Sequence, residues 1–185
     1  MNILETERLR LRTIEVEDAA FYYELVNDPT WLEFIGDKGI RSVEGARVAI
    51  IDGPRAMQQR CGHSLYVMER KSDGRTLGLC GLIQRDALPA ADIGYAIRPA
   101  FFGQGYTYEA AVAVLAYARE RLGMRRVLGL TAPGNANSIR LLQKLGLSYV
   151  ETRPLPPDDR LTNIYAIEFL SSDGVRSDIR TRPRR

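Results

Sequence analysis

Residues 97–110 read IRPAFFGQGYTYEA, and this stretch determines how the rest of the chain is interpreted. It starts at the end of an apolar strand pattern, passes through a Gly-x-Gly turn at Gly103 and Gly105, and opens directly into a helical pattern. The first turn of a helix carries backbone N–H groups without intrahelical partners, and the helix dipole adds partial positive charge there. The turn therefore predicts a binding site for a phosphate or pyrophosphate.

The segments around this turn alternate between strand and helix patterns. Apolar residues recur at helical spacing from the turn to Leu122, and Gly123 suits the position after a helix. Leu9 and Leu11 alternate with arginines as in a half-buried strand, and Ser42 suits an N-cap. The expected strands are residues 9–13, 65–69, 76–85, 92–98, 127–131, 147–150 and 163–170, and the expected helices are residues 15–27, 42–51, 106–122 and 137–145.

Two further stretches are expected to be irregular. Residues 31–39 are aromatic without a clear period, and residues 153–160 read RPLPPDDR, where the prolines argue against a continuous strand. No repeat and no long linker divides the chain, so residues 1–170 are expected to form one domain, followed by a basic tail over residues 171–185. The order of elements predicts an α/β or α+β fold with a mixed sheet.

Composition limits the class of protein further. The 185 residues are 45% apolar and 26% charged, as in a globular domain with a real core. No apolar run approaches the ~20 residues of a membrane span, and the N-terminal residues lack the apolar stretch of a secretory signal. Cys61 and Cys80 match no metal or redox spacing, which favours small core residues in a reducing cytoplasm.

The charge distribution gives little indication of a charged partner. A net charge of +3 is too small to indicate nucleic-acid binding, and we expect no membrane partner. Arginines gather in residues 176–185. A solvated terminus is the simpler interpretation of this cluster, and contact with an acidic surface or RNA is the alternative.

Two common phosphate-binding motifs do not fit the glycine turn. A dinucleotide-binding fingerprint would require a third glycine where the chain has Tyr108. A Walker A loop would end in Gly-Lys-Ser/Thr, whereas Gly105 is followed by Tyr106 and Thr107. For the glycines alone, a structural turn without a ligand is the favoured interpretation, so the surrounding residues must identify the ligand.

Several motifs in order make the chain resemble the GCN5-related N-acetyltransferase (GNAT) superfamily, in the branch that acetylates ribosomal-protein N-termini and related amines. Residues 102–107 stand in the register of the family signature Gln/Arg-x-x-Gly-x-Gly/Ala, although Phe102 replaces its polar first residue and Thr107 its small last one. The flanking matches are DIGYAIRP at residues 92–99, NANS at residues 135–138, KLGL at residues 144–147 and TERLRLR at residues 6–12.

This resemblance implies a fold, a cosubstrate and a reaction. The fold would be a central mixed, mostly antiparallel sheet, splayed between its fourth and fifth strands and flanked by helices. Acetyl-CoA would be the donor and a primary amine the acceptor, with direct transfer, no acyl-enzyme and no metal, in a monomer or homodimer. The implied cofactor contacts are Ile97, Arg98, Gly103, Gln104, Gly105, Tyr106, Thr107, Asn135 and Ser138.

The resemblance also suggests catalytic candidates. Asp92 is the candidate general base, acting through water, because some relatives place a catalytic glutamate on this strand; an exposed strand-end carboxylate is the alternative. Ser138 is the candidate acid for the leaving thiolate, and a helix residue that only bonds the backbone is the alternative. Many relatives carry a tyrosine where this chain has Leu142, which removes one common candidate acid.

The acceptor side is the least determined part of the sequence. Trp31, Phe34 and Asp37 are expected to line it, with core packing as the competing explanation for the two aromatic residues. The acceptor could be a protein N-terminus, such as that of a ribosomal protein, or a small molecule such as an amino sugar, antibiotic or polyamine. A module that binds acyl-CoA without catalysis is a further alternative.

Overall fold

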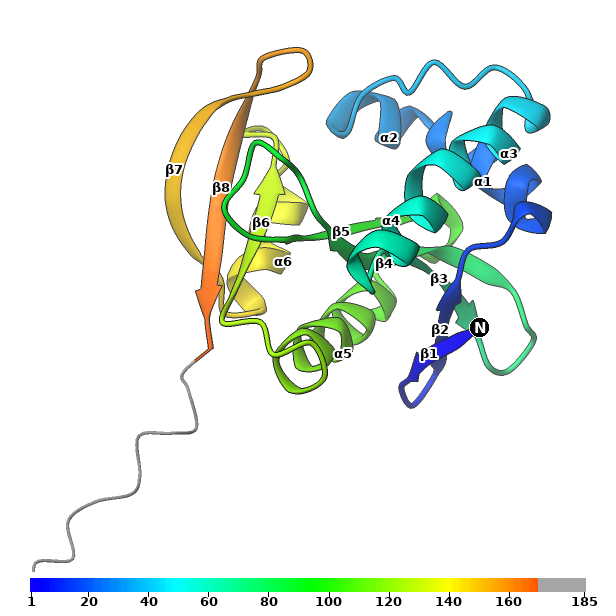
Figure 1. Cartoon of the computed structure of the whole chain (residues 1–185), viewed down its shortest axis with the longest axis horizontal. Coiled ribbons are helices and arrows are strands. Elements are labelled where there is room, and N and C mark those ends of the chain that lie inside the picture. The colour runs from blue at the N-terminus through cyan, green and yellow to red at the C-terminus, as the bar shows by residue number, and fades with distance from the viewer. Residues whose placement is uncertain (170–185) are drawn as a thin grey trace, which may run out of the picture.

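One mixed sheet organises residues 1–169, which are the residues that the computed structural model describes (Figure 1). Its strand order is β1-β2-β3-β4-β5-β6-β8-β7, and neighbouring strands run antiparallel except for β5 and β6. The strands are β1 (Asn2–Glu5), β2 (Leu9–Thr13), β3 (Leu65–Arg70), β4 (Thr76–Ile83), β5 (Asp92–Ile97), β6 (Arg126–Thr131), β7 (Ser148–Leu155) and β8 (Arg160–Glu168).

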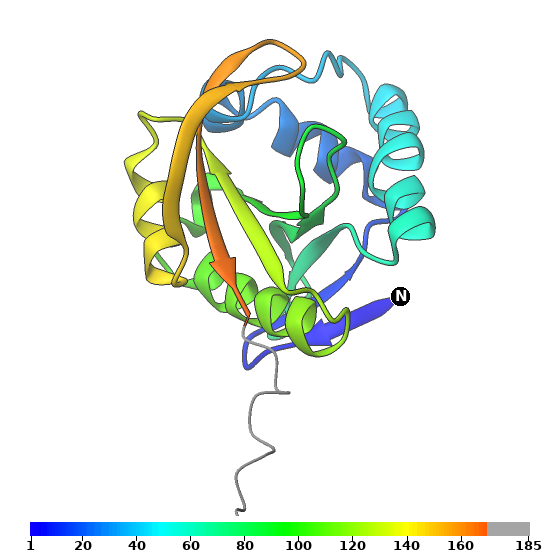
Figure 2. The same cartoon turned by 60° about the vertical axis from the view of Figure 1, so that its left-hand side comes forward.

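Helices cover both faces of this sheet (Figures 1 and 2). One apolar core joins α5 and α6 to the sheet, and a second joins α1, α2 and α3 to its other face. The α-helices are α1 (Ala19–Val26), α2 (Pro29–Phe34), α3 (Val43–Ile50), α4 (Ala56–Cys61), α5 (Tyr106–Glu120) and α6 (Ala136–Lys144), and the shorter helical turns are η1 (Val16–Asp18), η2 (Ile51–Arg55) and η3 (Pro99–Phe101).

The parallel pair β5–β6 is where the sheet opens. The two strands pair only at Asp92 with Leu128 and at Ile93 with Gly129. Beyond Ile93, β5 remains paired with β4, whereas β6 remains paired with β8. Each strand thus keeps one partner while the two separate from each other, and the predicted splay of the mixed sheet is confirmed at this position.

The main differences from the sequence prediction lie near α2. Residues 31–39 were expected to be irregular, but Pro29–Phe34 form a helix. The Asp28 side chain accepts a hydrogen bond from the Thr30 N–H at 2.9 Å, and Pro29 occupies the first turn, where its missing N–H costs nothing. The start signal was therefore in the sequence, although the helix is too short to show a clear apolar period. Strand β1 and helix α4 were also not predicted.

The prediction that residues 153–160 are irregular is also wrong. Residues 153–160 were expected to interrupt the strands, yet β7 continues through Arg153 and Pro154 to Leu155, and β8 begins at Arg160. Because β7 is the outermost strand and pairs with β8 alone, a residue that lacks an N–H can be accommodated there. The arginines of residues 176–185 and the rest of the expected tail lie outside the described residues. Within residues 1–169, no helix combines the length and apolar character needed to cross a bilayer.

The close approach of β4 and β5 gives a stability prediction. A Cβ at Gly78 would lie 2.1 Å from the Ala96 carbonyl oxygen and 2.6 Å from the Ile97 Cα. Because these are backbone atoms, Gly78→Ala must displace β5, and we expect it to lower the free energy of unfolding by about 3 kcal/mol. Gly134→Ala is the control, since no atom lies within 4 Å of its Cβ position. Equal denaturant midpoints for the two variants would contradict this packing.

Candidate functional site

The turn between β5 and α5 presents backbone N–H groups to solvent. Gly103 and Gly105 adopt positive φ angles of 72° and 80°, which glycine reaches without steric cost, and Gly105 caps α5. Among residues 1–169, no acceptor is found for the N–H groups of residues 103–107. Five N–H groups at the positive end of a 15-residue helix form an arrangement suited to a pyrophosphate.

Arg8 anchors this turn from the other end of the chain. Its Nη1 donates to the Gln104 carbonyl oxygen at 3.0 Å, and its guanidinium carbon lies 4.2 Å from the centre of the Tyr106 ring. Its Nε and backbone N–H both donate to the Glu109 carboxylate, at 2.6 and 2.9 Å. The β1–β2 turn therefore fixes the first turn of α5 through one arginine.

The same arginine also places positive charge beside the unpaired N–H groups. A Cβ at Gly105 would lie 3.4 Å from the Arg8 Nη2, and the Arg8 side chain is still 41% exposed. Burial acts to raise the pKa of Glu109, but hydrogen bonds from Thr6 and Arg8 outweigh it and lower the pKa. Glu109 therefore remains ionised and holds Arg8 where an anion at the turn would meet its guanidinium.

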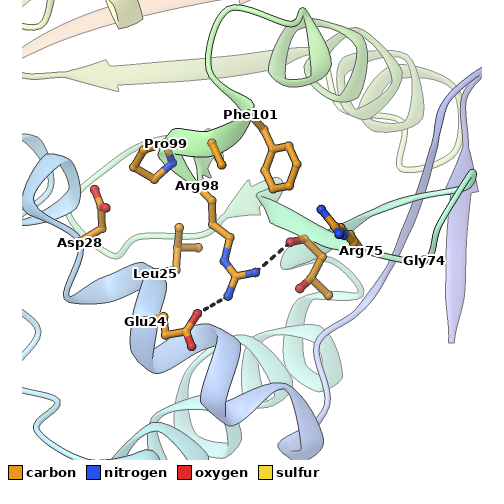
Figure 3. A pocket seen from close by; sticks show the side chains of 10 residues that line it. Glu24, Leu25, Asp28, Gly74, Arg75, Arg98, Pro99 and Phe101 are labelled. Atoms are coloured by element: carbon orange, nitrogen blue, oxygen red, sulfur yellow. Dashed lines mark hydrogen bonds and ion pairs between the residues drawn. The ribbon is translucent and has the colours of Figure 1, made fainter.

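Arg98 turns away from the glycine turn. Figure 3 shows its side chain reaching α1, where it forms an ion pair with Glu24, and its Nη1 donates to the Thr76 carbonyl oxygen at 3.5 Å. It lines a cavity of about 670 Å³ whose walls come from α1, the β3–β4 turn and η3. No lining residue of this cavity belongs to β6 or α6, so the cavity lies beside the β5–β6 opening and not within it.

The open edge of β5 carries backbone groups that have no partner in the described part of the chain. The Arg98 N–H bonds to Leu77 of β4, whereas the Ala91 carbonyl accepts from Leu128 of β6. Because successive residues of a strand point their backbone groups to opposite sides, the N–H groups of Tyr95 and Ile97 face the opening. Tyr95 is the first residue beyond the last β5–β6 pair to do so.

Ser138 meets a tyrosine hydroxyl at this opening. Its Oγ lies 2.9 Å from the Tyr95 Oη, which joins α6 to β5 beside the divergence. Burial raises the pKa of Tyr95 to about 12, and the hydrogen bond with Ser138 opposes this only in part. Tyr95 therefore keeps its proton at neutral pH and forms, with Ser138, a pair of adjacent hydroxyl groups that can donate one.

Asn135 sets the position of Ser138. Its side-chain oxygen accepts from the Ser138 N–H at 3.1 Å, which makes Asn135 the N-cap of α6, where Asn137 had been expected to open the helix. One turn further along α6, Leu142 is fully buried in the core beneath the sheet. Leu142, at the position where many relatives carry a tyrosine, thus packs in the core. The phenol in this region comes from Tyr95 of β5 instead.

Asp92 lies at the start of β5 in an ion pair. The residue is only 2% exposed, and its Oδ1 accepts from the Arg85 Nε at 2.7 Å. Burial raises the pKa of Asp92, and Arg85 opposes this shift. The carboxylate is therefore a stronger base than a free aspartate, but it is not the exposed strand end that the sequence left open.

Asp92 and Ser138 lie on opposite faces of the sheet. Ile93 and Tyr95 belong to the core under α5 and α6, whereas Ala96 packs against the core of α1 to α3. Alternation along β5 therefore directs Asp92 to the face of α1 to α3. The candidate base Asp92 thus lies on one face of the sheet at the β5–β6 opening. The candidate acids Tyr95 and Ser138 lie on the other face.

The predicted acceptor residues do not form one group. Trp31 belongs to the core of α1 to α3 and is only 7% exposed, although its Nε1 has no acceptor among the described residues. Phe34 is half-buried on α2. Asp37 is exposed and forms an ion pair with Arg41, whose hydrogen bonds lower the pKa of Asp37 to about 2. The position of Trp31 is explained by its packing in the core, and that of Asp37 by its ion pair within the loop.

Sequence reasoning did not single out Arg8, Arg85 or Tyr95. Arg8 was noted only as part of the TERLRLR stretch, and its contact with the glycine turn spans about a hundred residues of sequence. Tyr95 could have been found from strand alternation, because it shares the face of Ile97. For Arg85, only the antiparallel pairing of β4 with β5 reveals its closeness to Asp92.

Comparison with known proteins identifies relatives for most of the chain. Residues 8–148 match the family described as "Acetyltransferase (GNAT) domain". YkkB of Bacillus subtilis (strain 168) is 32% identical over 152 residues, which cover 80% of this chain and 87% of YkkB. YoaA of the same strain, described as an N-acetyltransferase, is 29% identical over 175 residues, which cover 89% of this chain and 96% of YoaA.

Solved structures share the fold. RimL, described as a ribosomal L7/L12 alpha-N-protein acetyltransferase in complex with coenzyme A, superposes with a TM-score of 0.78 at 19% sequence identity. The superposition covers 91% of this chain and 98% of RimL. At this identity the likeness establishes the fold alone.

The anchoring contact of Arg8 gives a binding prediction. Arg8→Met removes the hydrogen bond to Gln104 and a positive charge beside the turn. Because the side chain is partly exposed, we expect a loss of about 1 kcal/mol, or about fivefold in the affinity for coenzyme A measured by calorimetry. Arg10→Met is the matched control, since Arg10 pairs with Glu5 and Glu69. Equal affinities for both variants would show that Arg8 does not support the turn.

Proposed function

Because the chain belongs to the GNAT acetyltransferase family, it is an acetyl-CoA-dependent N-acetyltransferase, and we propose that it transfers the acetyl group in the β5–β6 opening to a primary amine. The observation that carries the proposal is the junction of this opening with the glycine turn. A cofactor whose pyrophosphate rests on residues 103–107 can extend its thioester arm along the unpaired edge of β5.

In this proposal the pyrophosphate and the pantetheine arm of the cofactor contact different parts of the chain. The N–H groups of Gly103, Gln104, Gly105, Tyr106 and Thr107 bind the pyrophosphate, with Arg8 beside them. The backbone of Ile97 and the side chain of Asn135 flank the pantetheine arm. For Arg98, only the backbone is a candidate contact, since its guanidinium pairs with Glu24.

The thioester oxygen fits the N–H of Tyr95 better than that of Ile97. At about 3.3 Å per residue, Tyr95 lies about 10 Å along β5 from Asp92, whereas Ile97 lies about 17 Å away. Only the shorter separation can be bridged by a carboxylate, one or two waters and an amine. An N–H aimed at the developing oxyanion in such a site contributes about 3 kcal/mol to transition-state stabilisation.

These residues can accept and donate the protons that move during the transfer. The neutral amine attacks the thioester carbon, the C–N bond forms, and the C–S bond breaks as the tetrahedral intermediate collapses. Asp92 accepts the proton that the amine nitrogen loses, through water. The Tyr95–Ser138 hydroxyl pair donates a proton to the thiolate on the other face of the sheet. Coenzyme A leaves as the thiol.

Two classes of acceptor fit the proposal. A protein N-terminus is the first, because an α-amino group with a pKa of ~8 is far easier to deprotonate than a lysine with ~10.4. RimL, which shares the fold, acts on an α-amino group of a ribosomal protein. A small-molecule amine is the second, and the charged side chains near Asp92 favour it.

The reaction can be tested with a panel of primary amines and acetyl-CoA. We expect release of the coenzyme A thiol together with an acetylated product detected by mass spectrometry. We also expect acetyl-CoA to raise the melting temperature in the absence of an acceptor. If acetyl-CoA gives no thermal shift and no amine in the panel is acetylated, the proposed function is wrong.

The hydroxyl pair gives a kinetic prediction. Tyr95→Phe removes the phenolic proton but retains the ring, so kcat is expected to fall about 10- to 100-fold with the Kd for acetyl-CoA unchanged. Tyr149→Phe is the control, because Tyr149 is exposed and, within residues 1–169, its hydroxyl bonds only to Thr152. A kcat within twofold of the unmodified protein would exclude Tyr95 from thiolate protonation.

Asp92 gives a pH prediction. Burial raises its pKa, and only the ionised carboxylate accepts a proton, so kcat is expected to fall as the pH decreases through that raised value. Asp92→Asn should abolish this acid limb and lower kcat at least 100-fold, whereas the exposed control Asp52→Asn should change neither. An unchanged acid limb in the Asn variant would remove Asp92 from the proton path.

A further inference from the structure

Three segments meet at the start of β5 on the face of α1 to α3. The Arg160 Nη2, at the tip of the β7–β8 hairpin, donates to the Glu33 carbonyl oxygen of α2 at 3.1 Å. Leu88, in the loop of residues 84–91, packs with Leu155 of β7. The hairpin tip and α2 lie at the same end of the molecule (Figure 1). The hairpin therefore joins the end of α2 to the loop that precedes β5.

Arg85 is held in place by a buried carboxylate. Asp92 accepts from its Nε at 2.7 Å and from its Nη2 at 3.4 Å. These bonds occupy one edge of the guanidinium, and Nη1 has no partner among residues 1–169. Because the Arg85 side chain is 41% exposed, its free edge can bind a further anion from solution.

A second cation lies on the loop that meets the hairpin tip, where the Arg160 Nη1 lies 3.0 Å from the Cβ position of Gly36. Lys38, in the loop between α2 and α3, is exposed and forms no ion pair within the described part of the chain. The surrounding protein lowers the pKa of Lys38, Arg85 lowers it further, and Asp158 opposes the shift. Two like charges near each other are destabilising, and an anion bound by both would relieve the repulsion.

The remaining charges nearby do not neutralise this pair. Asp92 is already paired with Arg85, and Asp158 lies 3.9 Å from the Arg160 Nε in a loose pair. The three cations Lys38, Arg85 and Arg160 thus face the two carboxylates of Asp92 and Asp158. Summed over these five groups alone the charge is +1, and the candidate base among them is directed to the face of α1 to α3.

We propose that the acceptor carries a carboxylate or phosphate close to its primary amine, and that Arg85 and Lys38 bind this anionic group. The inference rests on the proposed function, since it takes Asp92 as the residue that receives the proton of the amine. An anion on the free edge of Arg85 places the acceptor beside Asp92, with its amine directed along β5 toward Tyr95 and joined to the carboxylate through water. Arg85 and Lys38 determine which acceptor binds and take no part in bond making.

The test compares acceptors with and without this anionic group, each pair measured at a pH where both amines are mainly neutral. The pairs are alanine with alaninamide, O-phosphoethanolamine with ethanolamine, and a peptide that begins with Asp with one that begins with Asn. We expect kcat/KM to be at least about tenfold higher for the anionic member, as for one charge-assisted hydrogen bond. A preference in the first two pairs identifies a small-molecule acceptor, and one confined to the peptides identifies an acidic N-terminus.

Variants then assign the preference to the two cations. Lys38→Met and Arg85→Gln should each reduce the ratio within a pair to near 1 by raising the KM of the anionic acceptor, with the KM for acetyl-CoA unchanged. Lys38→Arg should retain the preference. Arg41→Met is the matched control, because Arg41 lies on the same loop and pairs with Asp37. Lys38→Met does not disturb Asp92, so it remains informative if Arg85→Gln misfolds.

The outcomes separate this inference from the proposed function. Acetylation of both members of every pair at equal kcat/KM would overturn the inference and leave the acetyltransferase activity intact. A preference that survives in both Lys38→Met and Arg85→Gln would also overturn it. The absence of turnover with any amine would overturn both the inference and the proposed function.

Discussion

The separation of β5 from β6 after Ile93 is the constraint on which the rest of the site depends. Two parallel strands inside a sheet normally satisfy each other's backbone groups along their whole length. Here β5 keeps β4 and β6 keeps β8, so the sheet stays continuous on both sides while an edge opens in its middle. The N–H groups of Tyr95 and Ile97 on that edge are available to a ligand that brings its own acceptors.

Each segment around the β5–β6 opening contributes a different chemical group to the site. The glycine turn provides unpaired N–H groups for an anion, and Arg8 ties that turn to the N-terminal strands. Helix α6 carries Ser138 to the hydroxyl of Tyr95 on one face. The loop before β5 brings Arg85 to Asp92 on the other face, and Lys38 lies on the loop between α2 and α3. Donor and acceptor can thus enter from opposite faces and meet where the strands separate.

The sequence was most informative where local chemistry determined the structure. The glycine turn, the strand before it and the long helix after it could be predicted, because positive φ angles and the apolar period are local properties. The N-cap at Ser42 could be predicted for the same reason. The short helix α2 could not, although Asp28 and Pro29 carried its start signal, because six residues are too few for a period.

The side-chain partners of the site were the least predictable part. The burial of Asp92 and its pairing with Arg85 follow from strand register, which no motif reveals. The contact of Arg8 with Gln104 and that of Tyr95 with Ser138 join segments far apart in the chain. At Pro154 the local sequence argued against a strand, and the tertiary arrangement decided otherwise. Pro154 is accommodated in β7 because β7 is the outermost strand of the sheet.

The central claim is that acetyl-CoA occupies the β5–β6 opening with its pyrophosphate on the glycine turn. Amide hydrogen exchange with and without acetyl-CoA tests it directly, because the N–H groups of Tyr95 and of residues 103–107 have no acceptor within residues 1–169. Acetyl-CoA is expected to slow exchange in both segments together. Unchanged exchange at Tyr95, with the cofactor bound, would contradict it.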